Sequence, residues 1–362
     1  MLQFDSTHLV DCISSRFKEP NITIDTMSDP LAFCIFCKED ATQRCSRCHS
    51  VLYCSKECQT AHYKTHKPNC KPSFEIVDVP GKGKGLVATR FIPSGSLILS
   101  ESPIVVSEII TGIDEMSSHW TKLCETVTKL DVKKKNLFLS LHNARPDLQL
   151  LGLFGSNSIT IPSFKDTNSS DTSKPKAAIF PTISRINHSC APNVVWSWNK
   201  QRSKEELRAI VDINTGSEIF ASYVNILFPS NNRKKELSYK YNFNCQCSIC
   251  SLPSNELEDS DQKRKEISKM QVEIKQMIKW GQTKHAYAKS LDILKIATDM
   301  GLEAYSVLPQ LYLDSYQLCS KFYGEHSTNE ETIELFDKGR QWAVRLRGNN
   351  TLFSKLERPV MS

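Results

Sequence analysis

Cysteine and histidine residues in this chain of 362 residues recur at the short intervals that tetrahedral metal sites require. Between residues 34 and 70 the sequence reads C-x2-C-x7-C-x2-C-x5-C-x3-C-x7-H-x3-C. Zinc prefers four sulfur or nitrogen ligands at tetrahedral angles, and a C-x2-C turn presents two thiolates to one ion. The pattern therefore predicts two closed zinc sites in a segment too short to fold by apolar burial alone. The eight predicted ligands are Cys34, Cys37, Cys45, Cys48, Cys54, Cys58, His66 and Cys70.

A second set of cysteines lies far along the chain. Cys245, Cys247 and Cys250 offer three thiolates, which leaves a tetrahedral zinc ion one ligand short. Cys190 is the best candidate for the fourth ligand. Eleven of the 14 cysteines and one histidine then supply twelve ligands, which predicts three Zn²⁺ ions. A reducing compartment favours this use of clustered thiols over disulfides.

Four separated motifs stand in a fixed order between the first cysteines and the last. They are Gly81-Lys82-Gly83-Lys84-Gly85-Leu86, Asn187-His188-Ser189-Cys190, Gly216-Ser217-Glu218-Ile219-Phe220-Ala221-Ser222-Tyr223 and Tyr241-Asn242-Phe243-Asn244-Cys245-Gln246-Cys247-Ser248-Ile249-Cys250. The first alone is typical of any tight hairpin. Together, and in this order, they resemble the motifs of the SET-domain protein lysine methyltransferases. With the first eight ligands, which resemble a MYND finger, the chain is similar to the SET-and-MYND family.

The resemblance implies an α+β, multidomain fold. Its expected parts are an irregular segment over 1–33, a MYND-type zinc finger over 34–70, a β-rich SET domain over 71–244 with a helical insert at about 117–150, a post-SET zinc segment over 245–252 and a C-terminal helical domain, resembling tetratricopeptide repeats, over 253–362. In the finger it implies crossed pairs, with Cys34, Cys37, Cys54 and Cys58 on one ion and Cys45, Cys48, His66 and Cys70 on the other. Unlike better-known members, this chain has its whole finger before the glycine turn.

The activity that the resemblance implies is methyl transfer from S-adenosylmethionine to a protein lysine. Such an in-line displacement depends on positioning, and the attacking amine must be neutral although free lysine has a pKa near 10.4. An apolar channel favours that proton loss. By resemblance Tyr223 is the catalytic residue, and Tyr241 and Phe243 form the walls of the lysine channel. The residues expected to bind the cofactor are Lys82, Gly83, Lys84, Asn157, Asn187, His188, Tyr223 and Phe243. By the same resemblance, Asn187 and His188 contact it through main-chain and amide groups, and Asn157 stands in a short strand over 155–160.

Two other functions stay open. The chain could be an interaction protein whose finger recruits a partner, such as a proline-rich peptide, while its SET fold is weakly active or inactive. The finger also carries six basic against three acidic residues, which is compatible with nucleic-acid binding. The complete set of motif residues favours the enzyme, with a histone or a non-histone protein as substrate.

Periodicity predicts the main elements. Strands are expected over 74–79, 86–91 and 96–100, and a polar loop over 166–176. Beyond the last cysteine, apolar faces predict helices over 256–280, 284–300, 303–323 and 329–347. The basic runs Lys133-Lys134-Lys135 and Arg233-Lys234-Lys235 are interpreted as solvated helix faces.

Composition and net charge limit the cellular locations and partners that we expect for the protein. No run approaches the roughly 18 apolar residues that cross a bilayer, and the first residues lack the layout of a secretory signal. The net charge of +6 is too small to require an acidic partner. We therefore expect an intracellular protein of the cytoplasm, the nucleus or both, without a membrane partner.

Overall fold

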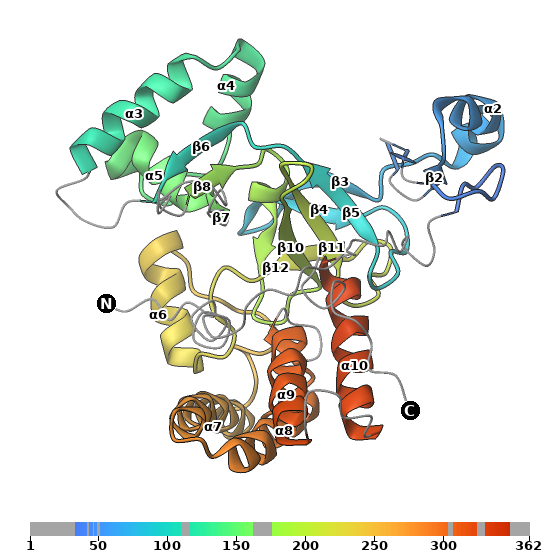
Figure 1. The fold of residues 1–362 in the computed structure, drawn as a ribbon. Coiled ribbons are helices and arrows are strands. Elements are labelled where there is room, and N and C mark those ends of the chain that lie inside the picture. The colour runs from blue at the N-terminus through green and yellow to red at the C-terminus, as the bar shows by residue number, and fades with distance from the viewer. Residues whose placement is uncertain are drawn as a thin grey trace.

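The computed structural model describes residues 33–41, 43–45, 47–48, 51–109, 116–161, 176–302, 307–323 and 330–347. The irregular segment predicted over 1–33 lies outside these residues except for Phe33, and the loop predicted over 166–176 does so except for Lys176. Within the described residues, no helix is long and apolar enough to span a membrane. Figure 1 shows a central group of strands with a small finger beside it, a helical insert above it and further helices below it. The predicted α+β fold is confirmed.

The finger is small and has few apolar side chains to bury. Its core consists mainly of cysteines, together with Ala41 and Tyr53. The hydroxyl of Ser55 accepts the N–H of Cys58 at 3.3 Å and so begins the helix. Such a core depends on metal binding for its stability. The elements of the finger are β1 (Gln43–Arg44), β2 (Leu52–Tyr53), α2 (Lys56–His66) and a 3-10 turn at Lys67–Asn69.

Three small sheets form the centre of the molecule, in the orders β3-β4-β12-β9, β10-β11-β5 and β6-β8-β7. Leu86, Ile98, Phe180, Leu207 and Ile219 are buried together between them. The strands are β3 (Phe74–Val79), β4 (Gly83–Ala88), β5 (Leu97–Glu101), β6 (Val105–Glu108), β7 (Ile159–Ile161), β8 (Lys176–Ile179), β9 (Asn187–His188), β10 (Val194–Asn199), β11 (Lys204–Ala209) and β12 (Glu218–Ala221).

The glycine turn joins β3 to β4. The predicted strand over 74–79 is found as β3, whereas the next strand begins earlier than expected, at Gly83, and ends at Ala88. The reason is the tightness of the turn, because Gly83 already pairs with Val79. Gly81 and Gly83 have φ of +73° and +72°, a conformation that favours glycine.

The helical insert consists of α3 (Met116–Thr128), α4 (Val132–Leu139), a 3-10 turn at Pro146–Leu148 and α5 (Gln149–Asn157). Leu123, Val127, Phe138 and Leu141 lie in its core. The insert extends beyond the predicted end at residue 150. It is tied to the central strands by the Nη2 of Arg185, which donates to the hydroxyl of Ser140 at 2.7 Å.

The remaining helices are α6 (Ser230–Tyr241), α7 (Ser254–Lys279), α8 (Thr283–Asp299), α9 (Val307–Tyr323) and α10 (Glu330–Arg347). α7, α8, α9 and α10 correspond to the four predicted helices, although their first or last residues differ from the predicted ones. α7, α8 and α9 pack in sequence around one apolar core, and α10 returns to β10 and β11 (Figure 1). The basic run at Lys133 and Lys134 is exposed on α4, as expected.

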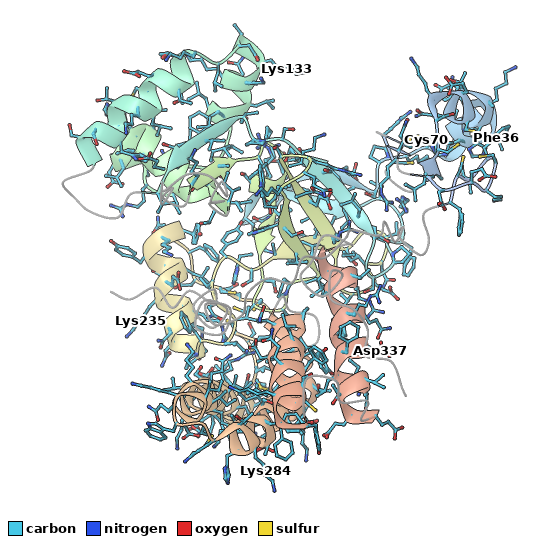
Figure 2. All side chains as sticks on the ribbon, in the orientation of Figure 1. Phe36, Cys70, Lys133, Lys235, Lys284 and Asp337 are labelled. Carbon is cyan, nitrogen blue, oxygen red and sulfur yellow. The ribbon has the colours of Figure 1, made fainter. Side chains whose placement is uncertain are left out.

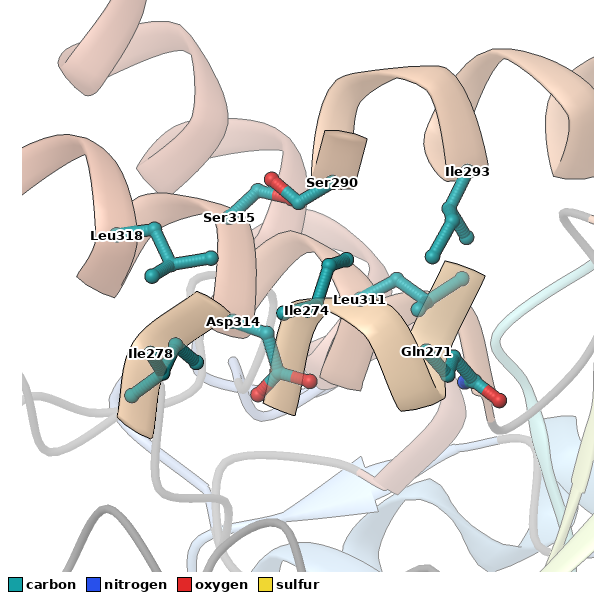
Figure 3. Close-up of a pocket in the computed structure, with 9 residues that line it drawn as sticks. All are labelled: Gln271, Ile274, Ile278, Ser290, Ile293, Leu311, Asp314, Ser315 and Leu318. Atoms are coloured by element: carbon teal, nitrogen blue, oxygen red, sulfur yellow. The ribbon is translucent and has the colours of Figure 1, made fainter. Parts of the chain in front are cut away.

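A small cavity lies between α7, α8 and α9 (Figure 3). Most of its wall is apolar, including Ile274 and Ile293. Four polar residues also line it, from all three helices: Gln271, Ser290, Asp314 and Ser315. The hydroxyl of Ser315 has no hydrogen-bond partner among the described residues, and burial raises the pKa of Asp314 to about 6. The cavity is therefore a packing gap with a few polar groups in its wall.

Candidate functional site

The eight predicted finger ligands meet in two groups. The ligand atoms of Cys34, Cys37, Cys54 and Cys58 all lie within 4.8 Å of one another, and so do those of Cys45, Cys48, His66 and Cys70. Zn–S bonds of about 2.3 Å at tetrahedral angles would place sulfur atoms about 3.8 Å apart. The Sγ–Sγ distances of 3.4 Å for Cys37 and Cys54 and 3.5 Å for Cys45 and Cys70 are close to that value. The residues therefore fit two zinc ions, in the crossed pairs that the resemblance implies.

A third group brings Cys190 together with Cys245, Cys247 and Cys250, again with sulfur atoms within 4.8 Å of one another. Cys190 is fully buried, and its Sγ lies 3.6 Å from that of Cys250. Four cysteines and no open position describe a structural zinc site rather than a catalytic one. The site joins the segment after β9 to the segment after α6.

Tyr223 follows the end of β12, and its hydroxyl is enclosed. The hydroxyl donates to the carbonyl of Ile186 at 2.5 Å. The Tyr223 ring lies 4.8 Å from the ring of Tyr241 and 5.3 Å from the ring of His188, while Phe243 lies 6.0 Å from His188. Burial raises the pKa of Tyr223 well above its ordinary value, so the phenol stays neutral and acts as a donor. Burial also raises the pKa of Tyr241 to about 12.

His188 connects the enclosed tyrosine to the third cysteine group. Its Nδ1 accepts the backbone N–H of Tyr223 at 3.0 Å, and its Nε2 lies 3.3 Å from the Sγ of Cys190. Burial lowers the pKa of His188 to about 4, so the ring is neutral at neutral pH. Since Nδ1 accepts, the proton belongs on Nε2 and points at the sulfur. The sequence predicted a main-chain role for His188 at the cofactor, whereas its ring serves this connection.

Parallel pairing of β12 with β9 brings Asn187 opposite Phe220 and beside the glycine turn. The Asn187 amide donates to Glu218 at 2.8 Å, and Lys82 forms an ion pair with the same carboxylate at 2.8 Å. A Cβ on Gly85 would lie 2.7 Å from Nδ2 of Asn187, whereas a Cβ on Gly83 would meet nothing within 4 Å. Gly85 therefore packs against Asn187, whereas the space beside Gly83 is open.

Glu218 was not singled out from the sequence. It lies within the predicted motif that ends in Tyr223, and its side chain is 14% exposed. Its role depends on Asn187 of β9 and Lys82 of the glycine turn, and sequence spacing does not report such contacts. A charged residue directly before the apolar Ile219 and Phe220 was the available signal.

Two predicted cofactor residues have other partners. The ammonium of Lys84 pairs with Asp78 at 2.7 Å across the β3–β4 hairpin and is half exposed. Asn157 is buried at the end of α5 rather than in the predicted strand, which begins only at Ile159. Its Nδ2 donates to the carbonyls of His142 and Leu153 at 2.6 and 2.7 Å. A helix had been missed here because Gly152 and Gly155 lower the helical signal.

The fold and the three cysteine groups define a zinc-binding α+β protein with an enclosed tyrosine beside one of its metal sites. Comparison with family models is specific: the SET domain model matches residues 83–224, and the MYND finger model matches residues 34–70. The chain thus matches both a SET domain and a MYND finger, the combination that the sequence resemblance implies.

Among curated relatives, the chain is 29% identical over 258 residues to the N-lysine methyltransferase SMYD2 of Bos taurus and 28% identical over 258 residues to that of Homo sapiens. Each match covers 69% of this chain and 55% of the relative. The histone-lysine N-methyltransferase set5 of Schizosaccharomyces pombe is 31% identical over 199 residues, 54% of this chain and 56% of the relative. The chain thus spans about half the length of the curated relatives it matches.

Proposed function

We propose that this chain is an S-adenosylmethionine-dependent protein-lysine N-methyltransferase with Tyr223 as the catalytic residue. The observation that carries the proposal is the environment of the Tyr223 hydroxyl. It is enclosed, bonded to the carbonyl of Ile186 and faced by the ring of Tyr241. The curated relatives are named as lysine methyltransferases, and they support this class of reaction.

The groups around the glycine turn fit the cofactor chemically. S-adenosylmethionine would supply a methyl group made electrophilic by its sulfonium charge. Asn187 and Lys82 offer an amide and a cation to its polar amino-acid part, and Phe243 offers an aromatic face to its flat base. The open space at Gly83 lets the backbone approach a ligand closely. Lys82 and Asn187 contact Glu218, and Lys84 and Asn157 also have partners within the protein. Because such a partner does not exclude a ligand, all eight predicted residues stay in the proposed cofactor site.

The chain's own groups would prepare the amine rather than take part in covalent chemistry. Exclusion of water from a channel between Tyr241 and Phe243, together with the cofactor's positive charge, would disfavour the ammonium form of a substrate lysine and favour the neutral amine. The phenol of Tyr223 stays protonated across physiological pH, and its hydroxyl donates to the carbonyl of Ile186. The carbonyl of Ile186 offers an acceptor at the same point, which can orient a donor or a weak C–H contact.

Transfer of labelled methyl groups to proteins of a cell extract tests the proposal. Tyr223→Phe removes the enclosed hydroxyl and is expected to lower the transfer rate about 100-fold, a typical effect of losing one preorganised donor. Tyr239→Phe is the matched control, because Tyr239 is 74% exposed on α6. Equal labelling by the wild-type protein and the Tyr223→Phe variant, with both folded by circular dichroism, would refute the proposed catalytic role.

A second function is supported by the surface of the finger. Phe33, Ile35, Phe36 and Tyr63 are 41 to 56% exposed, and Figure 2 labels Phe36 on the finger. Exposed aromatic side chains are the usual contact surface for extended proline-rich peptides, because such peptides present apolar proline rings and lose little conformational entropy on binding. We propose that this surface binds a proline-rich segment of a partner protein.

Fluorescence anisotropy with a labelled proline-rich peptide tests the finger surface. Phe36→Ala should weaken binding about 10-fold, whereas Phe91→Ala, at a 48% exposed residue outside the finger, should not. Equal affinities of the two variants would contradict the proposal. If the finger instead bound nucleic acid, binding would fall steeply with salt and would be lost on reversing the charges of Lys56, Lys64 and Lys67.

A further inference from the structure

Helix α6 turns one face toward the third cysteine group. Arg233 and Leu237, one helical turn apart, are both fully buried on this face, and Leu237 belongs to the same apolar cluster as Cys190 and Cys250. Lys235, labelled on α6 in Figure 2, is exposed. The interpretation of residues 233–235 as a solvated face is therefore wrong for the arginine. A fully buried guanidinium is costly unless opposite charge lies near it.

The groups around Arg233 indicate where that opposite charge is. Its Nη1 donates to the carbonyl of Phe228, whereas its Nε and Nη2 are buried without a hydrogen-bond partner among the described nitrogen and oxygen atoms. The side chains that interact with the guanidinium are those of Cys190 and Cys250, two members of the cluster that also contains Leu237. The guanidinium thus faces sulfur rather than carboxylate groups.

The charge of the metal site explains this arrangement. Four thiolates around one Zn²⁺ carry a net charge of about −2, and in this site they lie in a buried cluster. A cation next to the sulfur atoms stabilises the thiolate form that zinc requires.

We propose that Arg233 is the charge partner of the zinc site formed by Cys190, Cys245, Cys247 and Cys250, and that its guanidinium strengthens metal binding there. The inference concerns metal retention and does not depend on the proposed methyltransferase activity. Arg233 is thus a positioning residue that acts through the ligands.

Arg264 of α7 provides a matched control. It is equally buried, at 2% exposure, and its Nη1 donates to the carbonyl of Ile226 at 2.5 Å, as Arg233 does to Phe228. Both arginines therefore support the same connecting segment before α6. Arg264 lies on α7, which packs in the apolar core of the C-terminal helices, so it shares the structural role of Arg233 without the proposed role at the metal.

Pulsed alkylation in the presence of excess EDTA, followed by mass spectrometry, measures zinc loss at each site through the exposure of its cysteines. In Arg233→Met, the peptide with Cys245, Cys247 and Cys250 should become alkylated about 10 to 100 times faster than in wild type, the usual effect of removing a group that supports metal ligands. The finger cysteines should react at the wild-type rate. In Arg264→Met both sets should react as in wild type.

Two further variants keep the test decisive if the methionine variant does not fold. Arg233→Gln keeps a donor for Phe228 but has no charge, whereas Arg233→Lys keeps the charge. The proposal expects fast release from the glutamine variant and release within about threefold of wild type from the lysine variant. Equal release rates in these two variants, or equal rates in Arg233→Met and Arg264→Met, would overturn it.

Discussion

Glu205 on β11 makes folding stability depend on pH in an unusual direction. Its carboxyl group is 2% exposed, and its Oε2 has no hydrogen-bond partner among the described residues. Burial, followed by the nearby charge of Glu206, raises the pKa of Glu205 from 4.5 to about 8. Between these two values the native protein keeps a proton that the unfolded chain releases. Stability should therefore fall as the pH rises through this window.

The size of the effect follows from the shift. Below about pH 4.5 both states hold the proton, and the full stability is present. Between about pH 5.5 and about pH 7.5 the free energy of unfolding should fall by about 1.4 kcal/mol per pH unit, or up to about 3 kcal/mol in all. The decline ends above about pH 8, where Glu205 ionises in the native state as well. Glu205→Gln carries no titrating proton, so this part of the slope should disappear.

Urea unfolding at several pH values, with zinc in excess, measures the slope. Trp198 pairs with Glu205 in the sheet, so tryptophan fluorescence reports on the right region. Glu206→Gln is a second test, because it removes the neighbouring charge that adds to the effect of burial on Glu205. In this variant the pH window over which stability falls should narrow but should not vanish. Parallel stability curves for wild type and Glu205→Gln, without convergence at low pH, would refute the reasoning.

Three further predictions concern the cofactor and metal sites. Gly85→Ala should weaken S-adenosylhomocysteine binding at least about 10-fold by calorimetry, because the new Cβ would lie 2.7 Å from the amide of Asn187; unchanged affinity would contradict this. Cys247→Ser should lose about one of three zinc equivalents and also cofactor binding, whereas Cys45→Ser should lose finger zinc and keep cofactor affinity; equal effects would contradict separate sites. Glu218→Gln should weaken cofactor binding about 10-fold by calorimetry, since it removes the charge that holds a lysine at the turn; an unchanged affinity would rule out that role.

The metal groups could be predicted from the sequence because their chemistry fixes both residue type and spacing. Twelve ligands divide into three sets of four, and the choice of Cys190 from the motif Asn187-His188-Ser189-Cys190 completes that count. The C-terminal helices were also predictable, since residues such as Met270 and Ile274 mark one apolar face over many turns. Each of these signals repeats along the chain, so no single contact decides it.

The contacts between elements were not predictable in this way. Arg233 and Lys235 stand in one basic run, yet the first is buried against sulfur and the second is exposed, because only the packing of α6 distinguishes its faces. Lys84 stands in the glycine motif, but its cross-strand neighbour Asp78 holds it. Asn157 was placed by resemblance to a strand, and the helix that contains it ends at that residue. In each case the outcome depends on side-chain contacts of the folded chain that residue spacing does not report.

The arrangement around His188 gives the third metal site a role beyond local stability. The imidazole spans from the sulfur of Cys190 to the backbone N–H of Tyr223, and the same tyrosine donates to Ile186, two residues before His188. The position of the Tyr223 phenol is therefore set by a short series of hydrogen bonds that starts at the zinc ligand Cys190. Burial keeps this histidine neutral, so the path does not change across physiological pH. Loss of zinc from the site with Cys190 should therefore displace the Tyr223 hydroxyl before the surrounding sheets unfold.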